Sequence, residues 1–453
     1  MRAVALSLTL LLVLSAVAGA VPALPDGGTD AASVPTVSTP GASDSIQSSP
    51  LTEGPPMQVS GSNDTAATSI NVLGIPPSES TRSTLETEYV ELGSGLAFSS
   101  QTTDIRLETE AVVERIESAG SAEKRQQYLL QELSAIEQRI ITLNTRQRQV
   151  VEAYGRDELT PRRALYELAL IDAEARELQQ RRDRIETLTQ STPGFSISSS
   201  RFGNVELELN TLTGPVRGHA ASVLNGEADS TRFFVQSGDD SVVLGVIRDG
   251  TYVRESYRGV LRVGDGGSFS LPDAVNATEA AYPTITDLRL RDDVVGNPDS
   301  DSTRVTIEHD RGRLVAFVDS GSQRVFKEYQ FRPIDQVTTT SSTSAIKDGL
   351  ELTAHRTYPG GPVRLQLNST STDEPVDAQI TVGPAGGRSS VVGETGNDGS
   401  LWTLAPSGTY QVTAIDGSSV VVLSVEPTST PFVYGGINGS SNENGTETVT
   451  PVE

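Results

Sequence analysis

The sequence contains no cysteine, and among its 453 residues it has only three histidines, three lysines and one tryptophan. The absence of cysteine excludes disulfide bonds, thiol catalysis and cysteine-based zinc sites. The sequence also lacks a His-Glu-x-x-His helix, a Gly-x-Ser-x-Gly turn and a glycine-rich loop ending in Gly-Lys-Ser/Thr. The usual motifs of zinc hydrolases, serine hydrolases and nucleotide-binding proteins are therefore missing.

Acidic residues outnumber basic ones, with 59 Asp and Glu against 35 Lys and Arg and a formal net charge of −24. The only lysines are Lys124, Lys327 and Lys347, so nearly every cation is an arginine. In molar salt the Debye length falls to about 3 Å, which screens the self-repulsion of such a chain. The composition favours a high-salt habitat over the alternative of an ordinary acidic secreted protein. Nucleic acid is not an expected partner, because its phosphates bind basic surfaces.

The first twenty residues have the pattern of a secretory signal peptide. Met1-Arg2 precedes an apolar run from Ala3 to Ala18, and Ala18-Gly19-Ala20 is a small-residue cleavage site. The alternative is an uncleaved anchor, but a membrane span needs about 20 apolar residues and this run is shorter. We expect residues 1–20 to be removed after Ala20, and the mature chain to be extracellular, secreted or held at the cell surface, without a transmembrane segment.

Two segments are rich in Ser, Thr, Pro and Gly and poor in large apolar residues, and we expect both to be disordered. They are a linker over residues 21–84 and a tail over residues 427–453. Between the linker and about residue 192 the composition changes to Glu, Gln, Arg, Leu, Ile and Ala, which is typical of helices.

Residues 85–192 are predicted to form an antiparallel α-helical coiled-coil hairpin. The first arm has a 4,3 spacing typical of a coiled-coil seam: Leu129, Leu133, Ile136, Ile140, Leu143, Gln147, Val150 and Tyr154. Gly155 ends this arm, and Thr160-Pro161 begins a second one as N-cap and first helical residue. A shorter helix over 105–119 precedes them. A parallel dimer of arms is the alternative, so the oligomeric state stays open.

Polar residues interrupt both seams, at Gln147 and Arg182. They select the register, or they lie near an exposed end of the hairpin, which is the interpretation we favour. Several apolar residues lie beside the seams and form either the contact with the 105–119 helix or a docking stripe: Leu130, Ile141, Val151, Leu165 and Leu188.

Residues 193–337 are predicted to form an α+β module. Val205, Leu207 and Leu209 alternate with glutamates, as in a strand, and Gly214-Pro215 begins a short helix. Hairpins are expected over 241–257, across a type I′ turn at Asp249-Gly250, and over 304–319. A Ser/Thr linker is expected over 338–344.

Residues 348–426 contain only strand and turn patterns, which predict an all-β sandwich with the single tryptophan, Trp402, on a core strand. The strand at 374–382, the turn Thr395-Gly396-Asn397-Asp398-Gly399-Ser400 before 401–404, and Gly408-Thr409-Tyr410 before the next strand carry a resemblance. In this order they resemble the carboxypeptidase regulatory-like (prealbumin-like) domains, which implies an accessory module without catalysis.

The whole arrangement resembles secreted proteins of halophilic archaea whose domains have no assigned function. The signal, the Ser/Thr linker, the Arg/Glu-rich hairpin and the segments 212–217 and 249–255 carry this resemblance. It implies a compartment and a habitat, and no mechanism.

Candidate chemical sites are few. The three histidines, His219, His309 and His355, lie in separate segments. His219 is the least unsuitable candidate for a base in a Ser-His-Asp set, but a solvent-facing or packed histidine is the interpretation we favour. One loop gathers oxygen ligands without the spacing of an EF-hand, so calcium binding and a solvated loop both remain open: Asp292, Asp293, Asn297, Asp299 and Asp301. Five Asn-x-Ser/Thr sequons are candidate glycan sites: Asn63, Asn276, Asn368, Asn438 and Asn444.

These observations predict a multidomain, non-enzymatic interaction or structural protein, with no catalytic, cofactor or metal site. The expected partner is a protein or a cell-envelope component that binds the helical hairpin or the sandwich. The alternative is an extracellular hydrolase, or an accessory subunit of one. A carboxylate or a second histidine converging on His219 would favour the hydrolase, and an exposed apolar stripe on the hairpin would favour binding.

Overall fold

The computed structural model describes residues 69–89, 91–264, 269–296 and 300–433. The expected signal peptide with its cleavage site after Ala20, and the sequons at Asn63, Asn438 and Asn444, lie outside these residues. Of the helices in the described part of the chain, none combines the length and the apolar character needed to cross a bilayer.

Five helices follow one another in the first half of the described chain. They are α1 (Leu92–Glu117), α2 (Ala122–Gly155), α3 (Pro161–Gln190), α4 (Ser199–Leu212) and α5 (Pro215–Leu224). The Thr160 side chain accepts a hydrogen bond from the backbone N–H of Arg163, so the expected start of α3 is confirmed. Helix α1 is longer than the helix expected over 105–119.

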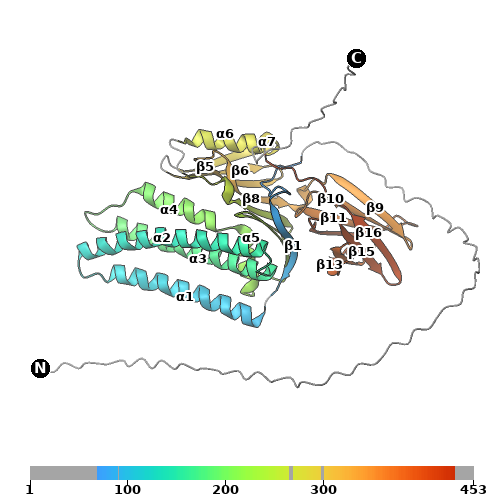
Figure 1. The fold of residues 1–453 in the computed structure, drawn as a ribbon, viewed down its shortest axis with the longest axis horizontal. Coiled ribbons are helices and arrows are strands. Elements are labelled where there is room, and N and C mark those ends of the chain that lie inside the picture. Colours follow the sequence, from blue (N-terminus) through green and yellow to red (C-terminus); the bar gives the residue numbers. More distant parts are fainter. Residues whose placement is uncertain (1–68, 90, 265–268, 297–299, 434–453) are drawn as a thin grey trace, which may run out of the picture. The chain divides into compact units, whose positions relative to one another are not determined.

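Helices α2 and α3 lie antiparallel and share their core with α1 and α4. Arg139 pairs with Glu174 and Arg146 with Glu167, so a later residue on α2 meets an earlier one on α3. Figure 1 shows α1 to α4 side by side. One apolar cluster joins all four helices, with members such as Ile116, Leu133, Ile171 and Leu209. The seam is thus covered from more sides than a two-helix hairpin would cover it.

The strand expected around Val205, Leu207 and Leu209 is wrong, because these residues belong to helix α4. The Ser198 side chain accepts a hydrogen bond from the Arg201 N–H and begins the helix. Phe202, Val205, Leu209 and Leu212 then recur at helical spacing in the shared core. Apolar alternation over only five residues fits both a strand and a helix, and here the cap and the packing decide.

The two polar positions in the seams are buried, so their expected place near an exposed end is wrong. Gln147 is 2% exposed and accepts a 2.5 Å hydrogen bond from Nη1 of Arg217 on α5. Arg182 is 7% exposed and pairs with Glu186 and with Glu206 of α4. Both side chains therefore connect the hairpin to the helices that follow it.

Eight strands form one antiparallel sheet in the order β1-β2-β3-β4-β8-β7-β6-β5. Their bounds are β1 (Ser80–Glu88), β2 (Thr231–Gly238), β3 (Ser241–Arg248), β4 (Thr251–Arg258), β5 (Arg289–Val295), β6 (Ser302–His309), β7 (Gly312–Asp319) and β8 (Val325–Pro333). The expected hairpin at Asp249-Gly250 is confirmed, with φ of 49° and 67° at its two turn residues. The hairpin of β6 and β7 is confirmed as well.

The expected disorder is wrong for the described parts of the linker and the tail, residues 69–84 and 427–433. Leu73 and Val433 are buried in the main hydrophobic cluster, and Val72 bridges to Phe432. Residues 80–84 belong to strand β1. β1 pairs with β2 along its whole length, from Ser80 opposite Gly238 to Glu88 opposite Thr231. The segment is polar because β1 is at the edge of the sheet, where only one neighbour is available.

The helices and the sheet share one hydrophobic core. A single cluster contains Phe98 of α1, Tyr154 of α2, Leu168 of α3 and Val216 of α5, together with sheet residues such as Phe233. Two further helices, α6 (Leu271–Ala281) and α7 (Pro283–Asp287), add Ala274 and other residues to the same cluster. The described residues between 69 and 338 are therefore packed as one unit.

The C-terminal strands form two four-stranded antiparallel sheets, as expected for a β-sandwich. One has the order β14-β11-β10-β9 and the other β13-β12-β15-β16. The bounds are β9 (Ser341–Lys347), β10 (Leu350–Arg356), β11 (Pro362–Ser369), β12 (Gln379–Pro384), β13 (Ser390–Glu394), β14 (Ser400–Leu404), β15 (Tyr410–Asp416) and β16 (Ser419–Val425). The linker expected over 338–344 is wrong from Ser341 onward, because β9 pairs with β10 there.

The sandwich packs against the eight-stranded sheet through a small apolar cluster. Phe234 and Tyr252 of the sheet meet Tyr358 and Leu404 of the sandwich. The Tyr252 hydroxyl donates a 3.0 Å hydrogen bond to the carbonyl of Gly360, whose φ is +76°. A Cβ at Gly360 would lie 2.5 Å from the Phe234 ring, so the close contact requires glycine.

Candidate functional site

The structure does not bring the histidines together with catalytic partners. Nε2 of His219 lies 3.2 Å from the Thr231 hydroxyl, and its ring packs against Phe233 at 5.8 Å. Burial lowers the pKa of His219 and, more strongly, lowers the pKa of His309 to about 4. Nδ1 of His309 accepts a hydrogen bond from a backbone N–H in its own turn. The Thr231 hydroxyl donates its proton to the carbonyl of Asp229 at 2.8 Å, so it is not directed at His219 as a nucleophile would be at its base.

Calcium binding by the oxygen-rich loop stays a prediction, because only part of the loop lies within the described residues. Asp292 and Asp293 lie exposed on β5, and Asn297 and Asp299 lie outside the described residues. Within the described ranges, no group of three or more acidic or histidine side chains could hold a metal ion.

The two segments singled out in the sequence, 212–217 and 249–255, meet in a buried ionic cluster. Nε of Arg217 lies 2.5 Å from Oε1 of Glu255, and both residues are completely buried. The Glu255 carboxylate lies at the start of α5, where any side chain on Gly214 would overlap it. The Gly214 N–H donates a 2.7 Å hydrogen bond to Asp172 on α3. The cluster thus fixes α5 between α3 and β4.

Lys327 of β8 completes this cluster without a carboxylate in direct contact. Its Nζ donates hydrogen bonds to the carbonyls of Thr211 and Thr213 at the end of α4. Burial lowers its pKa well below the ordinary range, and nearby Arg217 lowers it further. Burial also raises the pKa of Asp172, against the opposing effect of Arg176. These groups face protein atoms rather than a cavity, so their role is structural.

A second buried cluster ties the chain before β1 to the sheet. Glu328 accepts hydrogen bonds from Nη1 of Arg254 at 2.6 Å, from the Tyr282 hydroxyl at 2.6 Å and from the Leu73 N–H at 2.7 Å. Next to Leu73, Val72 forms a parallel bridge with Phe432, beyond the last strand of the sandwich. The described chain is thus closed on itself near both of its ends.

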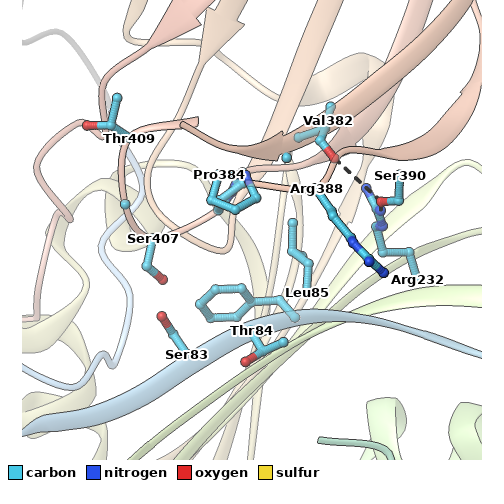
Figure 2. A pocket seen from close by; sticks show the side chains of 14 residues that line it. Ser83, Thr84, Leu85, Arg232, Val382, Pro384, Arg388, Ser390, Ser407 and Thr409 are labelled. Atoms are coloured by element: carbon cyan, nitrogen blue, oxygen red, sulfur yellow. Dashed lines mark hydrogen bonds between the residues drawn. The ribbon is translucent and has the colours of Figure 1, made fainter. Parts of the chain in front are cut away.

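A cavity of about 340 Å³ lies where the sandwich meets β1 and β2. Figure 2 shows Arg232 of β2 and Arg388, from the turn between β12 and β13, on one side of the cavity, and Ser83 and Ser407 on the other. Nη2 of Arg232 donates to the Ser390 hydroxyl, while its Nη1 is buried without a hydrogen-bond partner. The lining contains serine, threonine and apolar residues but no Asp or Glu.

Two guanidinium groups around an acid-free cavity favour an anionic occupant. Glu86 raises the pKa of Arg232, against the larger lowering caused by burial. Arginine matches a carboxylate through two parallel N–H···O bonds. The cavity can therefore bind an acidic group, and its lining has serine and threonine hydroxyls but no histidine or carboxylate to act as their base.

The arginines were missed by motif reasoning, although the sequence carries a signal for them. Arg232 lies in the acid-free stretch 230–238, and Arg388 lies in another, 378–393. In a chain with 59 acidic residues, such stretches mark places where an arginine has no local carboxylate. That the two stretches meet follows only from the fold.

The expected apolar stripe on the hairpin is only partly exposed. Leu130 and Ile141 are exposed on α2 at 42% and 59%, whereas Val151 and Leu165 are buried and Leu188 is half-buried. Exposed leucines also occur along α1: Leu92, Leu96 and Leu107. Nothing in the structure shows what would cover them.

Three family models match the chain. The first, described as domain of unknown function DUF7096, matches residues 1–229, and the second, family of unknown function DUF7094, matches residues 233–338. The third, an archaeal fibronectin-III type-like domain, matches residues 341–423. No curated protein and no solved structure gives a match.

The third match corrects the expected relationship of the sandwich. The expected β-sandwich is present, but the family model that matches it is of fibronectin-III type rather than carboxypeptidase regulatory-like. Turns with glycine before a Gly-x-Tyr strand recur in sandwiches of unrelated sequence, so the pattern could not separate the two groups.

Proposed function

The chain belongs to the DUF7096 family of unknown function, and on that premise we propose that it is an exported, non-enzymatic interaction protein at the cell surface of a halophilic archaeon. The N-terminal signal pattern supports export. The net charge of −24 and the scarcity of lysine support the high-salt habitat, and the archaeal description of the sandwich family supports the source.

The observation that carries the proposal is the acid-free cavity with Arg232 and Arg388. A chain with this excess of acid repels anionic partners in general, and two guanidinium groups at a cavity lined by no Asp or Glu make a local exception. We propose that an acidic group of an envelope component, such as a carboxylate, binds there. High salt screens the long-range repulsion and leaves this short contact in place.

The helical hairpin is assigned a supporting role. Its 4,3 spacing and the antiparallel pairs Arg139–Glu174 and Arg146–Glu167 support a coiled-coil seam closed within one chain. Because Val151 and Leu165 pack into the core with the sheet, the hairpin braces β1 and β2, which line the cavity.

Binding of the purified chain to isolated cell envelopes, measured by sedimentation in molar KCl, tests the proposal. The variant Arg388→Gln removes one exposed guanidinium and should weaken binding about tenfold or more, as expected for a lost charge-assisted hydrogen bond. Arg324→Gln is the matched control, because Arg324 is exposed and does not line the cavity. Equal binding of the two variants would rule out the cavity as the contact.

The hydrolase alternative has little support at His219, because the ring contacts the Thr231 hydroxyl, while the nearby Asp249 opposes the lowering of the His219 pKa without a hydrogen bond to the ring. It predicts turnover of an envelope polymer that His219→Ala abolishes. The interaction proposal predicts no product from envelope material and unchanged envelope binding by that variant.

A further inference from the structure

A second, larger depression of about 740 Å³ lies on the outer face of the sandwich sheet formed by β9, β10, β11 and β14. It is separate from the cavity with the two arginines and shares no lining residue with it. Its lining includes Trp402 of β14, Arg364 and Gln366 of β11 and His355 of β10, together with Asp335 and Asp398.

The strand register places these side chains in rows on one face. Trp402 is opposite Arg364, and Arg364 is opposite His355, so the three form one row across three strands. Gln366 is opposite Ser400 in the row two residues further along β11. Residues of the other alternation, such as Leu365, point into the sandwich core.

Trp402 is therefore not in the core, where it was expected. It is the only tryptophan in the chain, and it is half-buried on the wall of an open depression. The hydrophobic core of the sandwich does not include Trp402, so this side chain does not serve to fill the core. Its flat apolar face is instead available to a ligand, beside polar groups that can fix the orientation of that ligand.

The polar groups form an ordered chain of donors and acceptors. Nη2 of Arg364 donates to Oε1 of Gln366 at 2.9 Å, and Nε2 of Gln366 donates to Oδ1 of Asn368 and to the carbonyl of Asp398, both at 3.1 Å. These contacts hold the amide planes in place, while their remaining lone pairs and N–H groups can pair with ligand hydroxyls.

The depression has no excess of positive charge. Asp335 and Asp398 oppose Arg364, and burial together with Arg364 lowers the pKa of His355, which keeps that ring neutral near pH 7. The depression therefore lacks the positive excess that would select an anion, in contrast to the cavity of Figure 2.

We propose that this depression is a binding site for a neutral saccharide, with one sugar ring stacked on Trp402 and its hydroxyl groups paired with Gln366 and Asn368. Sugar rings present an apolar C–H face beside a rim of hydroxyls, which matches a single indole flanked by planar amides. The site binds the saccharide without transforming it.

The saccharide has two sources. It belongs to a polysaccharide outside the chain, or it is the glycan of the sequon Asn368-Ser369-Thr370, which begins in the same depression. Asn368 is four residues from Arg364 along β11, which is about 13 Å in a strand, so a short glycan on Asn368 could reach Trp402.

Fluorescence of the full-length chain tests the proposal, because all tryptophan emission comes from this depression. The probes are neutral hexasaccharides of glucose, mannose and N-acetylglucosamine and the neutral polysaccharide fraction of the host envelope. The chain is prepared from its host, both as the natural sequence and as Thr370→Ala, which removes the sequon and keeps Asn368.

A saturable shift in the natural chain identifies an external saccharide. A shift that appears only in Thr370→Ala, with a glycan found on the natural Asn368 peptide by mass spectrometry, identifies the chain's own glycan. Gln366→Ala should then weaken the binding about tenfold, whereas Gln379→Ala, an exposed amide on the other sheet, should leave it unchanged.

The proposal is overturned if no probe shifts the emission of either preparation, or if Gln366→Ala binds as tightly as the control. Chromatography of the hexasaccharides after incubation checks that the site binds the saccharide without cleaving it, since shortened products would show hydrolysis. None of these outcomes depends on Arg388, so the site fails or stands independently of the proposed function.

Discussion

Substitution of Glu255 by glutamine should destabilise the protein more than any surface change, because it leaves the buried Arg217 without its counter-charge. Both residues are 0% exposed, and the Arg217 Nε to Glu255 Oε1 distance is 2.5 Å. The Glu255 carboxylate also lies at the N-terminus of α5, where the backbone N–H of Arg217 donates to Oε2 at 3.5 Å. The variant keeps the shape of the side chain and removes only its charge.

Breaking a buried ion pair on one side costs about 3–5 kcal/mol. One neighbour reduces this cost, because Asp172 is repelled by Glu255 and gains from its removal. A net loss of about 3 kcal/mol is therefore expected, which is a large share of a typical folding free energy of about 5–15 kcal/mol.

The assay is urea denaturation in constant molar KCl, followed by circular dichroism of the helices that the cluster holds. A double-mutant cycle is completed with Arg217→Met and with the double variant Glu255→Gln/Arg217→Met. Because the double variant leaves no buried charge without a partner, it should be more stable than the sum of the single losses predicts, by about 2 kcal/mol. Strict additivity, or a loss under about 1 kcal/mol for Glu255→Gln, would refute the reasoning.

Further predictions concern pH, the junction, the chain boundary and salt. Burial raises the pKa of Glu88 from 4.5 to about 7, so the folded state holds a proton that the unfolded state has released. The stabilisation from Glu88 is therefore lost as the pH rises through this window, by about 3 kcal/mol in total, and Glu88→Gln should remove that loss when unfolding is compared at about pH 4.5 and about pH 8. Gly360→Ala should lower the melting temperature by several degrees, because its Cβ would clash with the Phe234 ring. An unchanged melting temperature would show that the contact between the sandwich and the eight-stranded sheet adjusts without cost. A chain that ends at residue 229 should not fold, since it lacks β2, the partner of β1, and a cooperative melt of that fragment would contradict the shared core. The melting temperature of the whole chain should rise steeply from dilute to molar KCl, and a flat curve would remove the high-salt argument.

The parts of the fold that could be predicted from the sequence are those whose signal is local. The 4,3 spacing and the Thr160-Pro161 cap predict α2 and α3, and Asp249-Gly250 predicts the β3–β4 hairpin. The strand expected in place of helix α4 is wrong because five alternating residues do not separate the two periods, whereas the N-cap at Ser198 indicates a helix.

Elements held by distant partners could not be predicted in this way. Strand β1 is polar, and its only partner in the sheet is about 150 residues away, so no local pattern indicates it. The cavity could not be predicted either, because its two arginines come from β2 and from the sandwich, which are far apart in the sequence. The shared core could not be predicted for the same reason, since the boundary between the first two family models, near residue 230, falls between α5 and β2 although both belong to one hydrophobic cluster.

Envelope binding measured for Arg388→Gln and Arg324→Gln side by side tests the central claim most directly. The account predicts a dissociation constant about tenfold or more higher for Arg388→Gln than for Arg324→Gln, with equal melting temperatures, since both arginines are exposed. Equal dissociation constants, or no binding of the natural chain to its envelope, would contradict it.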